Sequence, residues 1–309
     1  MKKVLVLESK RDQAKTLIAY LKKYTNYKIF TEQGVDYNGS ETFDLVIPAG
    51  ATSTLLYVEK SGDINLGTIT YTKANLITFD KIKTLKIVKE AGVPIPETFT
   101  QKNDIQKFPV FYKSLREEGY NERGIIQNQQ ELNKLTSTTI FYQEFINTQG
   151  TYAVGFIAEN GEMSCTFIQD ELVSYPKHGG SGVVLKSINE PRLIDYTNKI
   201  IKALNYSGWG LVEYKYCDIR KDYVFMEVNG KFWASIEFAF LNKPEFLEKL
   251  FEIKVPLRKT DIVIYMDRLI ISDFSEIKKA FPYLLKSKWI KKQGLIASIR
   301  KRFSKNKDT

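Results

Sequence analysis

The order of apolar and polar positions over the first 75 residues predicts strands that alternate with helices. Residues 2–9 form the continuous apolar run of a buried parallel strand, and the apolar spacing of 11–25 predicts a helix. The other elements predicted here are strands at 27–31, 43–50 and 68–72 and a helix at 53–60. This order indicates a small open parallel sheet with βαβ connections. No GxGxxG follows the first strand, so dinucleotide binding is not expected there.

Residues 76–255 are predicted to contain a mixture of helices, strands and hairpins. A helix with Ile82, Leu85 and Val88 on one face should end at Gly92, because glycine is favoured just past a helix end. The pattern further predicts strands at 108–114, 124–127 and 140–146, hairpins at 151–168 and 208–233, a long loop at 170–187 and a helix at 191–205. The chain is therefore expected to be an α/β protein of two or three lobes.

Polar side chains recur at every second position along the last predicted strand. Glu227, Asn229 and Lys231 share one face while Met226 and Val228 share the other, because strand side chains alternate between faces. An edge strand with a solvated polar face gives the same pattern. A chemical site is the alternative interpretation.

Two other polar residues bear on this choice. Glu213 lies on the partner strand of the same hairpin, so two antiparallel strands could bring Glu213, Glu227 and Asn229 together as three oxygen donors. Lys113 lies inside the apolar strand 108–114, where an unpaired buried ammonium group is costly. Its side chain must therefore reach either an anion or the solvent.

Charge and composition exclude several classes of protein. The formal net charge is +10, but eleven of the 46 lysines and arginines and no acid lie between Ile277 and Lys307, which leaves 35 basic and 36 acidic residues elsewhere. A nearly neutral body is not typical of a nucleic-acid-binding surface, and no nucleic acid is expected. No apolar run reaches the roughly 18 residues of a membrane span, so a cytoplasmic location is expected. Cys165 and Cys217 lack CxxC spacing and are expected to be reduced.

The motifs of the chain, taken in order, resemble those of the ATP-grasp superfamily, most closely its carbamoyl-phosphate-synthetase-like branch of small carboxylate-amine ligases. The segments that carry the resemblance are DK at 80–81, GVPIPET at 92–98, PVFYK at 109–113, YQEFI at 142–146, YPKHGGSG at 175–182, GLVEYK at 210–215 and MEVNGKFWAS at 226–235. The resemblance covers residues 1 to about 255. It implies an open parallel sheet that forms a pre-ATP-grasp domain over 1–75 and a two-lobed α+β ATP-grasp domain over 76–255. Beyond the resemblance, residues 256–309 are expected to form a basic helical extension.

This resemblance implies a site for ATP together with Mg²⁺ or Mn²⁺. Residues implied to bind the phosphates are Lys81 and Lys113, with Gly119 and Gly124 as the remains of a glycine-rich flap. Residues implied to bind the adenine are Gln143, Glu144, Phe145 and Ile146. The implied metal ligands are Glu213, Glu227 and Asn229, and Asn229 and Lys231 are the implied catalytic residues. Oxygen donors of this kind are what Mg²⁺ prefers.

The implied reaction is the joining of a carboxylate to an amine. The carboxylate takes the γ-phosphoryl group of ATP to form an acyl phosphate, and an amine then displaces phosphate. The expected substrates are a small-molecule or sugar-linked carboxylate and an amine, in surface-polysaccharide or natural-product biosynthesis. Such enzymes need no nucleophilic side chain. We interpret the single histidine, His178, as a loop residue rather than a substrate contact.

Several positions depart from the family pattern. Gly230 and Lys231 stand where relatives have proline and arginine, and Thr151 stands where many have an acid that binds the ribose, so that contact is unassigned. The flap, REEGYNERG at 116–124, is acidic and contains few glycines. These departures favour an alternative, a catalytically weakened ATP-binding regulator or scaffold. The presence of all three implied metal ligands favours the enzyme.

The C-terminal tail lies outside the resemblance. Leu295, Ile296, Ile299 and Phe303 form one helical stripe with basic residues around it. One interpretation is a helix packed on the core with its lysines in solvent, as amphipathic helices commonly are. The other is peripheral contact with an anionic membrane at the cytoplasmic face.

Overall fold

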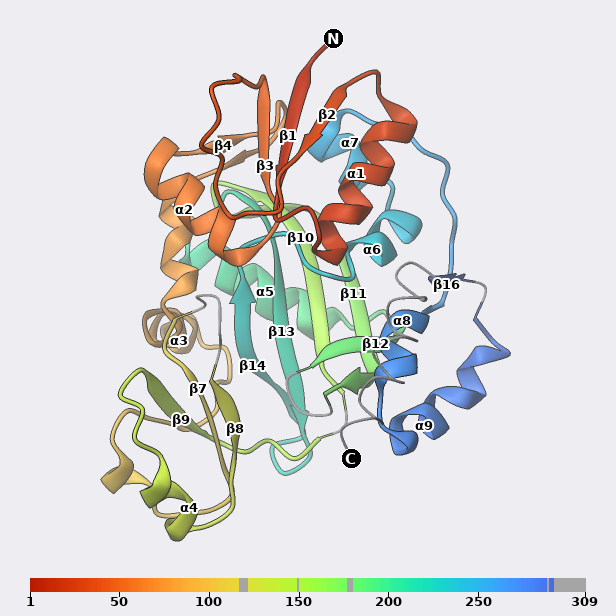
Figure 1. The fold of residues 1–309 in the computed structure, drawn as a ribbon. Coiled ribbons are helices and arrows are strands. Elements are labelled where there is room, and N and C mark those ends of the chain that lie inside the picture. Colours follow the sequence, from red (N-terminus) through yellow and green to blue (C-terminus); the bar gives the residue numbers. More distant parts are fainter. Residues whose placement is uncertain (117–121, 149, 177–179, 288, 292–309) are drawn as a thin grey trace, which may run out of the picture.

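The N-terminal part of the computed structural model contains a small parallel sheet, as the sequence predicts (Figure 1). The structure describes residues 1–116, 122–148, 150–176, 180–287 and 289–291. The first elements are β1 (Lys3–Leu7), α1 (Asp12–Tyr24), β2 (Lys28–Thr31), β3 (Leu45–Pro48) and α2 (Ala51–Ser61). The strands are all parallel in the order β2-β1-β3. The apolar run of β1 is buried because it is the central strand.

The short strand expected at 68–72 does not complete this sheet. Thr70–Tyr71 (β5) pairs antiparallel with Ile64–Asn65 (β4) in a separate two-stranded sheet. The Tyr71 ring packs 5.2 Å from the ring of Trp209, between ring centroids, and its hydroxyl donates to the carbonyl oxygen of Gly230 at 2.6 Å. These contacts turn the segment toward the large sheet of the next domain.

A four-stranded antiparallel sheet forms the smaller lobe of the central region. Its elements, together with the helices that flank them, are η1 (Lys73–Phe79), α3 (Lys81–Glu90), β6 (Thr98–Phe99), η2 (Lys102–Asp104), β7 (Val110–Ser114), β8 (Arg123–Ile126), α4 (Gln129–Lys134) and β9 (Ile140–Glu144). The strand order is β6-β9-β7-β8. Val110, Ile126, Leu132 and Ile140 belong to a separate small core of this lobe.

A seven-stranded sheet forms the larger lobe, in the order β14-β13-β10-β11-β12-β15-β16. Its first part comprises β10 (Tyr152–Glu159), β11 (Glu162–Tyr175), β12 (Ser181–Ser187), α5 (Pro191–Ala203), β13 (Gly208–Cys217) and β14 (Asp222–Asn229). The prediction of a long loop at 170–187 is wrong, because β11 continues to Tyr175 and β12 begins at Ser181. Val173, Val183 and Val184 enter a buried cluster there, which their polar and glycine neighbours in the sequence obscured.

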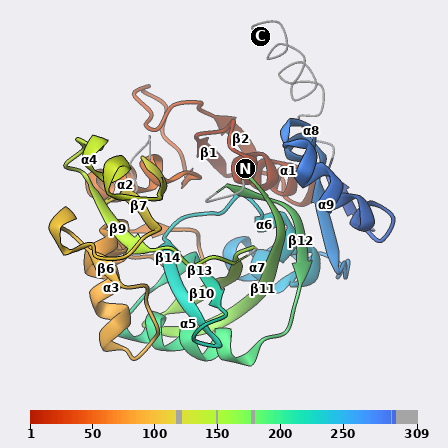
Figure 2. The same cartoon turned by 90° about the horizontal axis from the view of Figure 1, so that it is seen from below.

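The C-terminal extension is not purely helical, contrary to the expectation for 256–309. The remaining elements are α6 (Ile236–Asn242), α7 (Glu245–Phe251), β15 (Ile262–Tyr265), α8 (Met266–Ile271), α9 (Phe274–Leu284) and β16 (Trp289–Lys291). β15 pairs with β12 and β16 pairs with β15, so the extension adds two strands to the large sheet. Figure 2 shows α8 and α9 at the periphery beside β12. The predicted tail helix, which begins near residue 294, lies outside the described residues.

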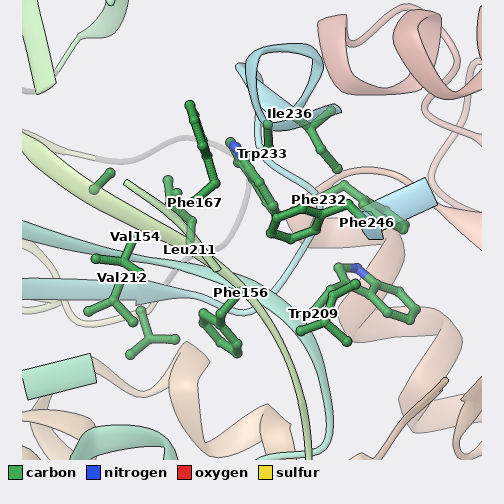
Figure 3. Packing of buried hydrophobic residues seen from close by; sticks show 14 of the residues in the cluster. Val154, Phe156, Phe167, Trp209, Leu211, Val212, Phe232, Trp233, Ile236 and Phe246 are labelled. Carbon is green, nitrogen blue, oxygen red and sulfur yellow. The ribbon is translucent and has the colours of Figure 1, made fainter. Parts of the chain in front are cut away.

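The main core lies on the large sheet and under the segment that follows β14 (Figure 3). The rings of Trp209 and Phe232 stack with centroids 4.6 Å apart, and the Trp233 ring meets Phe246 edge-on at 6.0 Å. Gly155 of β10 has no Cβ, and an added Cβ would lie 2.6 Å from the Trp233 ring. This packing fixes the residues immediately after Asn229. Among the described residues, no helix is long and apolar enough to cross a membrane.

Candidate active site

The hairpin of β13 and β14 brings together the three residues that the sequence implies as metal ligands. Glu213 and Glu227 are direct partners in the antiparallel register, and Asn229 lies opposite Leu211, two residues further along β14. The amide nitrogen of Asn229 donates to Oε1 of Glu213 at 2.9 Å. The solvated edge face is therefore not what the structure shows, because Asn229 is buried and all three side chains line a cavity.

Three lysines surround Glu227. Lys81 is the first residue of α3, and the N-cap Asp80 accepts a hydrogen bond from the backbone nitrogen of Lys83. The ammonium group of Lys81 lies 3.3 Å from Oε2 of Glu227. Burial would raise the pKa of the Glu227 carboxyl, but the neighbouring ammonium groups outweigh burial and lower the pKa to about 2. These groups belong to Lys81, Lys113 and Lys231. Glu227 is therefore ionised at neutral pH within a positively charged site.

Lys113 lies on β7 of the four-stranded sheet, and its side chain reaches β14 of the seven-stranded sheet. Its side chain is only 6% exposed, and its ammonium group donates to the carbonyl oxygen of Met226 at 3.0 Å and lies 5.5 Å from the centroid of the Phe141 ring. The interpretation that Lys113 extends into solvent is therefore wrong. The ammonium group instead lies beside β14, where it bonds Met226 and lowers the pKa of Glu227.

Lys231 contacts the neighbouring amide rather than standing alone. Its ammonium group donates to Oδ1 of Asn229 at 2.7 Å. The glycine before it has a packing reason, since a Cβ at Gly230 would lie 2.5 Å from Oγ1 of Thr78 and 2.9 Å from the hydroxyl of Tyr71. The proline expected from the family pattern would place a Cβ in that space.

The residues implied to bind adenine separate into two groups. Glu144, Phe145 and Ile146 line the cavity, and the carboxylate of Glu144 forms an ion pair with Arg220 from the β13–β14 turn. Gln143 does not line the cavity; its amide nitrogen donates to Oγ1 of Thr98 at 3.2 Å. Strand alternation explains the difference, because adjacent residues of β9 face opposite sides.

Of the two implied flap glycines, only Gly124 is described, and it lies against a ring rather than in the cavity wall. An added Cβ at Gly124 would lie 2.7 Å from Cε1 of Tyr112. Arg123, its neighbour on β8, lines the cavity instead and pairs in register with Lys113. Gly119 and His178 lie outside the described residues.

The cavity between the four-stranded and the seven-stranded sheet has a volume of about 540 Å³. Besides the residues already named, the cavity is lined by several that sequence reasoning missed: Arg123, Glu171, Lys215, Arg268, the first turn of α1, and Lys10 and Arg11 just before that helix. Lys215 follows Glu213 by two positions on β13, so strand alternation could have revealed it. Arg268 comes from the C-terminal extension, and no local signal connects it to the site.

Glu171 of β11 lies beside Thr151, the position where the family pattern led us to expect an acid. The backbone nitrogen of Glu171 donates to the carbonyl oxygen of Thr151 at 2.9 Å, and both residues line the cavity. Burial raises the pKa of Glu171 to about 7, although Arg268, the hydroxyl of Ser174 and Lys215 oppose this shift.

The donor set is suited to a divalent cation that is shared with a nucleotide. Glu213 and Glu227 supply two carboxylates and Asn229 an amide oxygen. Among the described residues, no group of three or more His, Cys, Asp and Glu side chains is placed to hold a metal ion. Mg²⁺ is commonly bound by one or two carboxylates while phosphates and water complete its shell. The residues therefore fit Mg²⁺ or Mn²⁺ bound together with phosphate oxygens.

Comparison with known proteins decides the family. A family model described as the ATP-grasp domain matches residues 78–235, just over half of the chain. The chain belongs to the ATP-grasp family. This match contains Lys81, Lys113 and the whole β13–β14 hairpin. No curated protein sequence matches the chain significantly.

Solved structures with the same fold extend the comparison over most of this ATP-grasp protein. D-alanine–D-alanine ligase from Bacillus anthracis is 14% identical with a TM-score of 0.57, and the match covers 82% of this chain and 97% of the ligase. The biotin carboxylase domain of 2-oxoglutarate carboxylase from Hydrogenobacter thermophilus is 14% identical with a TM-score of 0.60, covering 82% and 69%. Pyruvate carboxylase from Rhizobium etli is 14% identical with a TM-score of 0.60; the match covers 79% of this chain but only 27% of that enzyme.

Proposed function

We propose that this ATP-grasp protein is an ATP- and Mg²⁺-dependent ligase that joins a carboxylate to an amine through an acyl phosphate. The observation that carries the proposal is the convergence of Glu213, Glu227 and Asn229 with three lysines in one cavity between the two sheets. The Hydrogenobacter thermophilus domain, which shares the fold, was solved with magnesium ADP and bicarbonate. We also propose that the chain divides into three parts, at 1–75, 76–255 and 256–309.

The proposed roles follow from charge and position. Lys81, Lys113 and Lys231 neutralise the triphosphate and the charge that develops as the γ-phosphoryl group moves to the substrate carboxylate. Glu213, Glu227 and Asn229 hold the cation, which supplies further charge neutralisation when it is bound. Glu144, Phe145 and Ile146, which line the cavity, bind the adenine. The amine then attacks the acyl phosphate, the amide bond forms and phosphate leaves.

The test is an ADP-release screen of the full chain with Mg²⁺ and ATP. Panels of amino acids, hydroxy acids and uronic acids are each offered with and without an amine donor. Release that requires both substrates supports the proposal. We expect Glu227→Gln to lower that release at least about 100-fold, whereas Glu162→Gln, at an exposed position of the large sheet, should keep it. Undiminished release by a folded Glu227→Gln variant would contradict the assignment.

A second candidate function is that of an ATP-binding regulator with weak catalysis. It is favoured by the ion pair that already engages the Glu144 carboxylate and by the lysine that replaces arginine at 231. Calorimetry separates the two candidates. Tight, Mg²⁺-dependent ATP binding without ADP release for any substrate pair would favour the regulator.

Membership of the family does not by itself specify the substrates or the location of this protein. We infer a small-molecule or sugar-linked carboxylate, in surface-polysaccharide or natural-product biosynthesis, and a cytoplasmic protein whose basic tail contacts the inner face of the membrane. The charge distribution supports the location, because the excess of basic residues is confined to Ile277–Lys307.

A further inference from the structure

The outer face of α9 carries an apolar stripe that no described part of the chain covers. Phe274, Phe281 and Leu285 are 77%, 64% and 88% exposed. Their spacing of seven and four residues places them on one side of the helix, since 3.6 residues make one turn. On another side, Ala280 is buried, and Ile277 and Leu284 pack on the same core cluster as Val183 and Leu269.

Exposed large hydrophobic side chains are more frequent around α9 than elsewhere in the described part of the molecule. Of the eight large hydrophobic side chains that are exposed among the described residues, four lie between positions 274 and 290: Phe274, Phe281, Leu285 and Ile290. Single exposed apolar residues need no explanation, but a contiguous apolar face commonly marks a binding surface. Figure 2 shows α9 at the edge of the molecule.

The surroundings of the stripe are basic. Lys278 lies one turn from both Phe274 and Phe281, and Lys286 follows Leu285 directly. The two acids nearby, Asp273 and Glu276, lie at the start of the helix; Glu276 is buried and pairs with Lys279 at 2.8 Å. From Ile277 to Lys307 the sequence contains no acid.

Charge decides among the possible occupants of this face. A second copy packed face to face would bring the lysines of both helices together. The chain's own segment 292–307 carries six further basic residues and no acid, so it would also bring like charges onto α9. An anionic surface with an apolar layer beneath it matches both the lysines and the stripe.

We propose that the outer face of α9 is a peripheral membrane-binding surface. Phe274, Phe281 and Leu285 enter the boundary between headgroups and acyl chains, and Lys278 and Lys286 face anionic headgroups. The proposal extends the location inferred above and does not depend on the ligase activity.

The first test is co-sedimentation of the full chain with vesicles. Wild-type protein is expected to bind vesicles of phosphatidylglycerol and phosphatidylcholine at low salt, to bind pure phosphatidylcholine far more weakly and to be released at high salt. The triple variant F274S/F281S/L285S should bind at least about tenfold more weakly. The control variant I219S/L257S removes two side chains outside α9 that are 96% and 59% exposed, and it should bind as the wild type does.

Two readouts decide the remaining outcomes. Equal vesicle binding by the wild type and by a triple variant with unchanged thermal unfolding overturns the proposal. In sedimentation velocity without vesicles, the wild type should match the triple variant in size. A wild-type dimer that the variant abolishes, without vesicle binding, overturns the proposal in favour of a contact between copies.

A fluorescent reporter tests whether the face is free before binding. Phe281→Cys, labelled with a polarity-sensitive dye, should give a water-exposed spectrum in buffer and shift to the blue on anionic vesicles. Wild-type protein treated with the same dye controls for labelling of Cys165 and Cys217, which are free thiols. A spectrum already blue in buffer, and unchanged by vesicles, means that the face is covered and overturns the proposal.

Discussion

Single residues of the site are placed so that opposite charges offset each other before any nucleotide binds. Glu227 is ionised because its neighbours are lysines, and Lys81 is held only 3.3 Å from it. Glu171 lies in the same cavity, yet burial there raises its pKa to about 7. Two carboxyls of one cavity therefore have pKa values on opposite sides of the ordinary value of 4.5.

Glu227→Gln should destabilise the nucleotide-free protein at neutral pH by about 1–3 kcal/mol, because it leaves three ammonium groups without their carboxylate. A lowered pKa means that the wild-type advantage is complete above pH 4.5 and disappears as the pH falls toward 2. Urea denaturation between pH 3 and pH 8 measures this. A variant as stable as the wild type at pH 7 would show that the ion pair contributes little.

Glu171→Gln should act in the opposite sense. Because the folded protein raises this pKa, wild-type stability declines between pH 4.5 and about 7, and the neutral amide avoids that loss. The variant is expected to melt a few degrees above the wild type at pH 8.5 and at nearly the same temperature at pH 4.5. Thermal melts across this range check the sign, and a variant less stable at pH 8.5 would contradict it.

At the scale of elements, the β13–β14 hairpin is held in place by the aromatic segment that follows it. Phe232 stacks on Trp209 and Trp233 fills the space over Gly155 (Figure 3). Gly230 is the point where β5 and η1 press against the end of β14, through Tyr71 and Thr78. The position of Asn229 and Lys231 therefore depends on contacts outside the hairpin.

Gly230→Ala should lower the free energy of unfolding by about 1–3 kcal/mol, because the added methyl group overlaps Oγ1 of Thr78 and the hydroxyl of Tyr71. Gly34→Ala is the matched control, since its Cβ would meet nothing closer than 3.5 Å. Denaturant titration of both variants measures the difference. Equal stability of the two variants would mean that Tyr71 and Thr78 move aside at little cost.

At the scale of the whole molecule, Arg268 ties three parts of the chain together. From α8 it donates to the carboxylate of Asp12 in α1 at 2.7 Å and to the carbonyl oxygen of Gly182 in β12 at 2.6 Å, and it lies 4.2 Å from the Tyr265 ring centroid. Lys291 of β16 makes a second tie through its 2.7 Å ion pair with Glu237. Through Arg268, the C-terminal extension thus forms part of the cavity wall.

Arg268→Ala should destabilise the protein by about 2–4 kcal/mol, because a buried guanidinium with two strong hydrogen bonds is lost. Arg192→Ala provides the control: Arg192 pairs with Asp222 at 3.1 Å, but its side chain is about half exposed, so its loss should destabilise the protein much less. Urea denaturation compares them. Similar losses for both would show that the tie between domains carries no special weight.

Local patterns along the chain were enough to predict features that neighbouring residues encode. The period of two along β14 predicted the shared face of Glu227, Asn229 and Lys231, and the apolar runs predicted the small parallel sheet. The order of weak motifs indicated the ATP-grasp family, which the domain match confirmed. The roles of individual site residues remain predictions.

The folded structure was needed to show which distant segments meet. It placed Arg268 and the start of α1 in the cavity wall, turned Gln143 away from the cavity, joined β15 and β16 to the large sheet and left the α9 stripe exposed. A local pattern records which face of an element is apolar but not which partner covers that face. That choice depends on packing between residues as far apart as Asp12 and Arg268, whose side chains meet although 256 positions separate them.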